Sequence, residues 1–148
     1  MSLSVLGELV QNLRKISCFQ PNEVFFYDYQ NLPQEAVDIL NNVNKILNNR
    51  DDNIFERVEK TGDMVFKADI VTINCPLHEK SKGLFNKELI SKIKRESYVV
   101  DTTRFSMCVA EDIAEAVKSG HLGGYGGDTW NFQPAPAYHP LRFAKQRW

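Results

Sequence analysis

The sequence predicts an α/β fold with a doubly wound parallel sheet. Between residues 68 and 128, short runs rich in β-branched residues alternate with runs of helical period, in the order strand, helix, strand, helix, strand. This alternation favours right-handed βαβ units and a parallel sheet covered by helices. Each predicted strand of this stretch is followed by polar residues. Because the carboxyl ends of parallel strands share one edge of a sheet, these residues form a candidate ligand site.

The first half of the chain adds further elements to this sheet. Apolar residues from Leu3 to Ile16 recur with a period near 3.6 and predict an amphipathic helix. Pro33 suits the first turn of the second predicted helix. The other elements of this half are a buried strand at 24–27, a helix at 33–48, a short strand at 55–58 and a short helix at 61–67.

The second half contains the clearest elements of the chain. The predicted strands cover residues 69–74, 98–102 and 122–128, and the predicted helices cover 87–93 and 109–118. After Trp130, three closely spaced prolines predict an irregular loop at 131–140.

Composition bounds the class of protein. The 148 residues suffice for one domain with its own core, and 43% hydrophobic with 25% charged residues is ordinary for a globular chain. A net charge of -1 argues against nucleic acid or a membrane surface as partner. The first residues do not form a signal peptide, so we expect a cytoplasmic protein. Cys18, Cys75 and Cys108 lack zinc-ligand spacing and predict free, buried thiols rather than a metal site.

Asp28 directly follows an early predicted strand, and this position allows two interpretations. In dinucleotide-binding folds an acidic residue there accepts hydrogen bonds from the adenosine ribose. A solvated turn aspartate is the alternative, and position alone leaves both open.

Several segments together resemble one family. They are Tyr27–Gln30, Thr72–His78, Lys82–Ser91, Cys108–Gly120, Gly124–Trp130 and Gln133–Pro136. They are similar to NAD-dependent formate dehydrogenases of the D-2-hydroxyacid dehydrogenase superfamily, over a stretch from about Leu13 to Arg142. The resemblance implies a Rossmann-type cofactor domain, NAD as cofactor and formate as substrate. The implied reaction is hydride transfer that yields carbon dioxide and NADH.

The resemblance also assigns site residues. Arg104 matches the arginine that orients the substrate carboxylate, and its planar charged fork suits that group. Gln133 matches the glutamine that pairs with the family's catalytic histidine. The residues matched to NAD are Asp28 at the ribose, Pro76, Leu77, His78, Glu79 and Lys80 over the adenosine half, and Thr102 and Asp128 near the nicotinamide.

The chain also departs from the family pattern. It has no GxGxxG motif, and the matching region reads Leu6-Gly7-Glu8-Leu9, with a carboxylate where a diphosphate is expected. Asp101 and Phe105 replace an asparagine and a glycine of the family pattern, and Asp101 is placed to pair with Arg104. The family's catalytic histidine and substrate-binding asparagine have no counterpart.

These departures predict a single partial NAD-binding domain over residues 1–148, lacking the first strand, the Gly-rich turn and the substrate domain. A missing central strand would leave an empty slot in the sheet. The flanking strands would then close up, a partner would supply a strand, or the chain would be unstable. We expect formate dehydrogenase-like function that is impaired or inactive in this chain alone. The alternative is a non-catalytic NAD-binding or oligomerisation module, in a homodimer or in a heterodimer with an intact relative.

Overall fold

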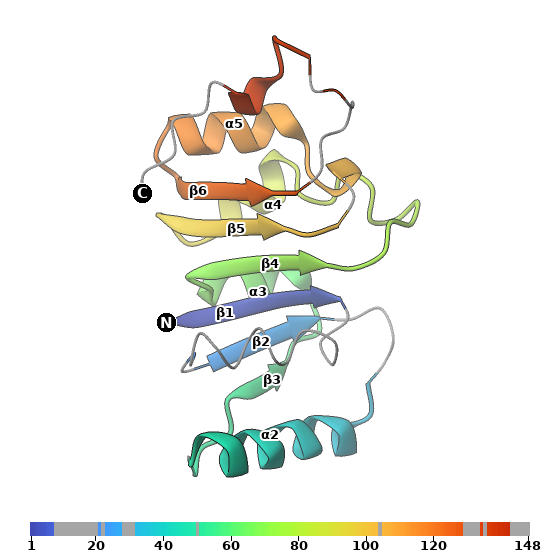
Figure 1. The fold of residues 1–148 in the computed structure, drawn as a ribbon, viewed down its shortest axis with the longest axis vertical. Coiled ribbons are helices and arrows are strands. Elements are labelled where there is room, and N and C mark those ends of the chain that lie inside the picture. Colours follow the sequence, from blue (N-terminus) through green and yellow to red (C-terminus); the bar gives the residue numbers. More distant parts are fainter. Residues whose placement is uncertain are drawn as a thin grey trace.

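A six-stranded parallel sheet in the order β3-β2-β1-β4-β5-β6 forms the centre of the computed structural model (Figure 1). The structure describes residues 1–7, 21, 23–27, 32–49, 51–103, 105–128, 134 and 136–142. The strands are β1 (Ser2–Gly7), β2 (Glu23–Tyr27), β3 (Phe55–Arg57), β4 (Ile70–Asn74), β5 (Ser97–Asp101) and β6 (Leu122–Gly127). This is the strand order of a doubly wound dinucleotide-binding sheet, so the predicted fold class is confirmed.

The predicted absence of the first strand is wrong. β1 lies between β2 and β4, and Leu3 is in register with Val24 on one side and with Ile70 on the other. The helix predicted from residue 3 is therefore wrong for residues 3–7, and residues 8–16 lie outside the described residues. The Leu3–Leu6 spacing fits either period in so short an apolar run, and pairing with two neighbouring strands decides in favour of the strand. The sheet has no empty slot, so none of the three predicted routes around one is needed.

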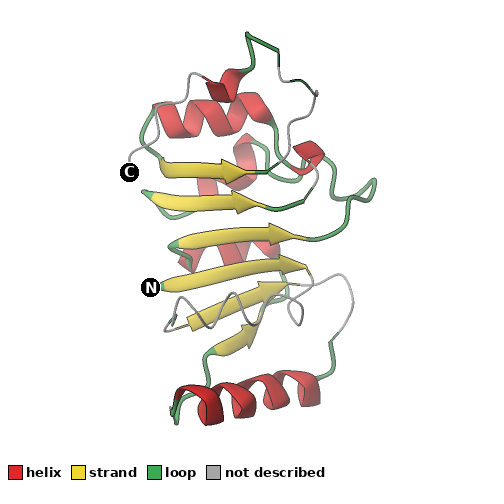
Figure 2. Cartoon of the chain, in the orientation of Figure 1, coloured by secondary structure: helices red, strands yellow, loops and turns green. Residues whose placement is uncertain are grey.

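The helices lie where the sequence predicts them, within one or two residues at most ends. They are α2 (Gln34–Asn48), α3 (Thr61–Lys67), α4 (Lys87–Lys92) and α5 (Ala110–Lys118), with two 3₁₀ turns at Phe105–Met107 and Pro140–Arg142. α3 and α4 cover one face of the sheet, whereas α2 lies beyond β3 and α5 beyond β6 (Figures 1 and 2).

Two apolar clusters make up the core. The larger one joins β4 and β5 to α3, α4 and α5, and its fully buried side chains include Phe85, Met107 and Ile113. The smaller one packs α2 against β2 and β3 around Phe26 and Val37. Each of these side chains contributes roughly 1.5–3 kcal/mol by leaving water, so the larger cluster fixes the strands that end at the candidate site.

Asn41 of α2 fastens the edge strand β3 to the rest of the domain. Its buried side-chain oxygen accepts hydrogen bonds from the amides of Ile54, at 3.0 Å, and Phe55, at 2.9 Å. Its amide group donates to the Phe55 carbonyl at 3.2 Å. Only a side chain with both an acceptor and a donor satisfies this set, which explains an asparagine on the buried face of the helix.

Candidate functional site

The carboxyl ends of the strands meet at one edge of the sheet, where the strand order reverses between β1 and β4. β1 ends at Gly7, which is in register with Asn74 at the end of β4. Ligands of doubly wound folds bind in the crevice at such a reversal. Gly7 is the residue that the sequence matched to the start of the phosphate-binding turn, and Glu8, which follows it, lies outside the described residues.

Thr102 and Asn74 form a polar pair across the ends of β5 and β4. The Thr102 hydroxyl lies 2.7 Å from the Asn74 side-chain oxygen and 3.2 Å from the Ile73 carbonyl, and it can donate to either. Asn74 donates its own amide hydrogen to the Thr72 hydroxyl at 3.0 Å. The pair holds the edge beside the reversal in one geometry while the Thr102 side chain remains exposed.

Asp101, the last residue of β5, is a buried carboxylate with three side-chain donors. One oxygen accepts from the Thr103 amide at 2.9 Å and from the Thr103 hydroxyl at 2.6 Å. The other accepts from the Cys108 thiol and the Tyr125 hydroxyl, each at 3.4 Å. The carboxylate is only 2% exposed and points into the domain. Its described partners are internal donors. The predicted partner Arg104 lies outside the described residues, so their pairing stays a prediction.

Burial and the Asp101 carboxylate together raise the pKa values of two ionisable side chains, Cys108 and Tyr125. Burial, followed by the charge of Asp101, raises the pKa of the Cys108 thiol far above its usual range. Burial also raises the pKa of the Tyr125 hydroxyl. Both groups are therefore protonated at neutral pH and act as hydrogen-bond donors to Asp101. Cys75 is also free and buried, so the predicted buried thiols are confirmed for these two cysteines.

The Ser81 side chain forms hydrogen bonds with the backbone of the loop that follows β4. The buried Ser81 hydroxyl accepts from the His78 amide at 2.8 Å and lies 3.1 Å from the His78 carbonyl. That carbonyl also accepts from the amides of Ser81 and Lys82. The predicted cofactor residues of this loop, Pro76, Leu77, His78, Glu79 and Lys80, all have exposed side chains. The backbone of the loop is therefore fixed while its outer surface is open to a ligand.

The segment after residue 104 is tied to the segment after this loop. Gly83 donates to the Ser106 carbonyl at 2.8 Å, Phe85 donates to the Met107 carbonyl, and Val109 donates to the Phe85 carbonyl, both at 3.0 Å. Together with the Asp101–Thr103 bonds, these contacts fix the chain on both sides of the predicted Arg104. Gln133 and Asp28 also lie outside the described residues.

Asp128 follows β6 at the same edge. Its amide approaches the Asp101 carbonyl at 3.4 Å. Its carboxylate is exposed and has no partner among the residues that the structure describes. Of the predicted site residues, the structure thus brings Thr102, Asp128 and the loop 76–80 to one edge of the sheet.

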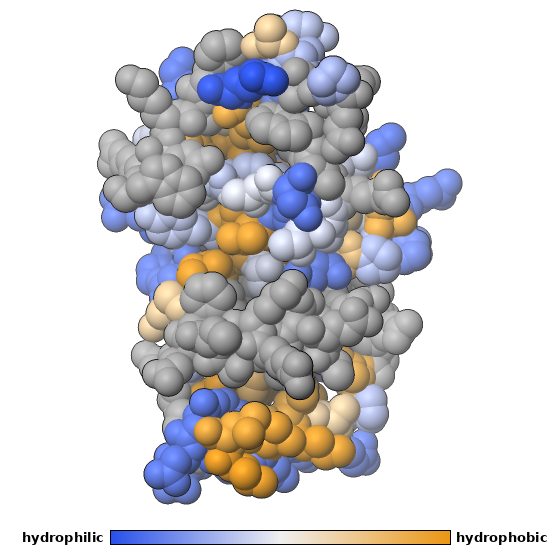
Figure 3. Space-filling view, in the orientation of Figure 1, coloured by the Kyte–Doolittle hydropathy of each residue, from blue (hydrophilic) through white to orange (hydrophobic). Residues whose placement is uncertain are grey.

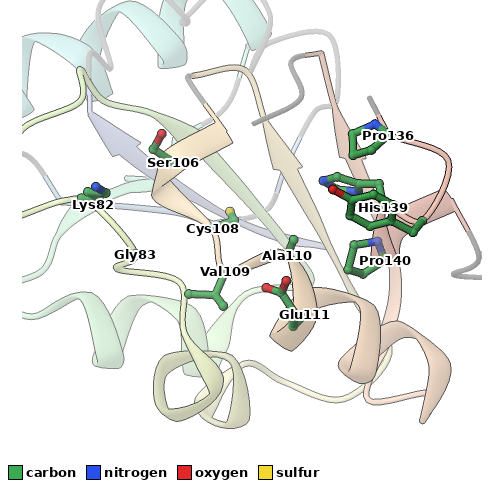
Figure 4. Close-up of a pocket in the computed structure, with 11 residues that line it drawn as sticks. Lys82, Gly83, Ser106, Cys108, Val109, Ala110, Glu111, Pro136, His139 and Pro140 are labelled. Atoms are coloured by element: carbon green, nitrogen blue, oxygen red, sulfur yellow. The ribbon is translucent and has the colours of Figure 1, made fainter. Parts of the chain in front are cut away.

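A pocket of about 390 Å³ lies beside this edge and was not predicted from the sequence. It opens between the start of α5, Ser106 and the segment 136–140, which face one another in Figure 4. Lys82, Glu111 and the buried His139 are among its polar lining residues. None of the predicted site residues that the structure describes lines it.

The described edge fits a dinucleotide in its general form. β1 supplies a strand that ends in glycine at the reversal, and exposed polar side chains follow β4, β5 and β6. Within the described ranges, no three His, Cys, Asp or Glu side chains gather as metal ligands. The same residues include no helix long and apolar enough to cross a bilayer.

Comparison with known proteins points to one family. Residues 36–147 match the family described as D-isomer specific 2-hydroxyacid dehydrogenase, NAD binding domain. The chain is 57% identical over 130 residues to truncated formate dehydrogenase 2 of Saccharomyces cerevisiae, an alignment that covers 88% of this chain and 55% of that protein. It is 49% identical to formate dehydrogenase of Neurospora crassa, covering 95% of this chain and 33% of that one. The chain thus spans about a third to just over half of these curated relatives.

Solved structures agree with this assignment. The formate dehydrogenase of Granulicella M. superposes with a TM-score of 0.83 at 27% identity, over 100% of this chain and 36% of that one. An NAD-dependent formate dehydrogenase from Staphylococcus aureus, solved with NAD, gives a TM-score of 0.75 at 28% identity, over 99% and 40% of the two chains.

Proposed function

Because this chain belongs to the D-isomer specific 2-hydroxyacid dehydrogenase family through its NAD-binding domain, we propose that it is a formate dehydrogenase-like module that binds NAD at the carboxyl edge of its sheet. Hydride transfer from formate, giving carbon dioxide and NADH, is the reaction of the proposed parent activity. We propose that this activity is impaired or absent in the chain alone. The observation that carries the proposal is the strand order β3-β2-β1-β4-β5-β6, with exposed residues following β4, β5 and β6 at the carboxyl edge of the sheet.

The chain's own residues have distinct roles in this proposal. Asp28 accepts hydrogen bonds from the adenosine ribose and disfavours a 2′-phosphate. The outer surface of the loop 76–80 covers the adenosine half, and Thr102 and Asp128 border the nicotinamide half. NAD, when bound, supplies the hydride acceptor. Arg104 orients the formate carboxylate through its fork, and Gln133 holds a histidine partner where one is supplied.

Calorimetric titration with NAD, and with NADP as the comparison, tests this function. We expect millimolar or tighter binding with preference for NAD. Asp28→Ala should weaken NAD binding about 10- to 150-fold, since a charge-assisted hydrogen bond contributes roughly 1.5–3 kcal/mol. Glu59→Ala, which removes an exposed carboxylate that has no partner among the described residues, is the matched control. A folded sample that shows no binding at several millimolar NAD would overturn the proposal.

Activity is measured separately, as formate-dependent NADH formation. We expect none above background from the chain alone. The second candidate function is a non-catalytic module in a homodimer or in a heterodimer with an intact relative. The exposed apolar side chains of α2, which are Ile39, Val43, Ile46 and Leu47, favour it (Figure 3). Light scattering of the chain alone detects a homodimer. Light scattering of its mixture with formate dehydrogenase 1 of S. cerevisiae detects a heterodimer.

We further propose that residues 1–148 act as one partial NAD-binding domain. The single sheet that joins the described strands supports one domain, and the missing GxGxxG motif is where it departs from the family pattern. A cytoplasmic location is also a proposal, supported by the free, buried thiols of Cys75 and Cys108.

A further inference from the structure

The pocket of about 390 Å³ beside the start of α5 has the size of a small-molecule site. Such sites enclose roughly 300–1,000 Å³, and this one lies toward the lower end of that range. Figure 4 shows Lys82 and Ser106 on one side, the segment 136–140 on the other, and Glu111 of α5 between them in this view. A small molecule bound here would contact several separate segments of the chain.

Hydrogen bonds hold the backbone of the pocket walls. The Gly83 amide donates to the Ser106 carbonyl at 2.8 Å, and the His139 amide donates to the Pro136 carbonyl at 3.0 Å. The buried His139 ring accepts from the Leu141 amide through Nδ1 at 3.4 Å. The pocket is therefore built into the fold, and a ligand does not have to order its walls.

Three polar side chains line this pocket without a hydrogen-bond or ion-pair partner among the described residues. They are Lys82, Ser106 and Glu111. Lys82 and Glu111 carry opposite charges but do not pair with each other, whereas other charged side chains near α5 are paired, such as Lys87 with Glu115. A molecule that carries both a negative and a positive charge can pair with Lys82 and Glu111 at the same time.

Much of the remaining lining is apolar. Val109, Pro136 and Pro140 are half-buried and line the pocket, together with the buried Ala110. These side chains offer no hydrogen-bond donor and no charge, so they favour an apolar group of the ligand. The two charges and the apolar wall together define a ligand with a charged and an apolar part.

We propose that this pocket binds the zwitterion of an α-amino acid with an apolar side chain. The Lys82 ammonium and the Ser106 hydroxyl bind its carboxylate, and the Glu111 carboxylate binds its ammonium group. The apolar side chain of the ligand contacts the apolar wall. A simple acid would leave the charge of Glu111 unpaired beside its own, and a simple amine would do the same at Lys82. The inference does not rest on NAD binding.

Nuclear magnetic resonance titration of the isotope-labelled full chain with L-leucine tests the site. Two analogues of the same shape each lack one charge, because 4-methylpentanoate has no amine and 3-methylbutylamine has no carboxylate. We expect leucine to shift the amide signals of Gly83, Val109 and Glu111 with a millimolar dissociation constant. Each analogue should bind about 3- to 10-fold more weakly, because it loses one ion pair.

Two variants test the assigned orientation of the ligand. Lys82→Met should weaken leucine binding about 3- to 10-fold and leave 3-methylbutylamine binding no weaker, because that amine has no carboxylate to lose. Glu111→Gln should weaken leucine binding to a similar extent and leave 4-methylpentanoate binding no weaker. Lys118→Met removes an exposed lysine of α5 that does not line the pocket, so it is the matched control and should leave all three affinities unchanged. Circular dichroism checks that each variant is folded.

Three results would overturn the proposal. In the first, leucine at about 20 mM shifts no amide signal around the pocket. In the second, either analogue binds as tightly as leucine, so that the pocket does not recognise both charges. In the third, folded Lys82→Met and Glu111→Gln variants bind leucine as wild type does, or Lys118→Met weakens binding as much as they do.

Discussion

Removal of the Asp101 carboxylate should destabilise the protein by about 2–4 kcal/mol. In Asp101→Ala the Tyr125 hydroxyl and the Cys108 thiol each lose a hydrogen bond to a buried carboxylate, and hydrogen bonds to charged groups contribute roughly 1.5–3 kcal/mol. The thiol is the weaker donor and lies at the low end of this range. Thr103 is half-buried, so water can replace its lost bonds at lower cost. This loss is a large part of a typical total stability of roughly 5–15 kcal/mol.

Asp101→Asn removes the negative charge of residue 101 but keeps a side chain that can form hydrogen bonds. The asparagine oxygen can still accept from Thr103, and its amide can donate to Tyr125, whose hydroxyl is free to rotate and accept. We therefore expect a loss below about 1 kcal/mol. Urea unfolding followed by far-ultraviolet circular dichroism measures both variants, with Glu59→Ala as a control expected within about 0.5 kcal/mol of wild type. Equal stabilities for the alanine and asparagine variants would refute the assigned role of the network.

Three further perturbations follow from the structure. Asn41→Leu should cost about 2–4 kcal/mol in urea unfolding, because three backbone groups near β3 lose their partner; a loss under about 1 kcal/mol contradicts this. Gly123→Ala should cost about 1–3 kcal/mol, because its Cβ would lie 2.6 Å from the Glu96 carbonyl oxygen; a wild-type melting temperature would show that the backbone yields. Lys94, followed by the Ser2 amide, lowers the pKa of Asp69 below its ordinary 3.8. The carboxylate therefore stabilises the fold above that pH and loses this effect as pH falls through its folded pKa. Asp69→Asn should thus lower stability at pH 7 and converge with wild type in acid, whereas a difference independent of pH would exclude the ion pair.

Most elements could be predicted because local signals agree with the tertiary structure. The helix at 87–92, for example, has Asn86 as its cap, whose side chain accepts from the Leu89 amide at 3.1 Å. The first strand could not be predicted with the same rules. Its apolar residues fit two periods, and its identity is decided by β2 and β4, one of which lies more than sixty residues away in the chain. At β1 the local apolar pattern favours a helix, whereas pairing with β2 and β4 favours a strand.

The site shows the same division between local and long-range information. Asp101 stood out in the sequence as an added charge, but its partners Cys108 and Tyr125 reach it only through the packing of β5 against β6. Ser81 gave no sequence signal, because its role is to hold the His78 backbone. These groups are buried, and hydrogen bonds within the protein account for their polar atoms.

The described residues that the resemblance assigns to NAD have the opposite character. Thr102, Asp128 and all five residues of the loop 76–80 have exposed side chains, although they adjoin buried groups in the chain. Buried Asp101 directly precedes exposed Thr102, and buried Ser81 directly follows the exposed loop. In the proposed NAD-binding role, the inward residues would fix the edge in advance of binding and so lower the conformational entropy lost when the ligand binds.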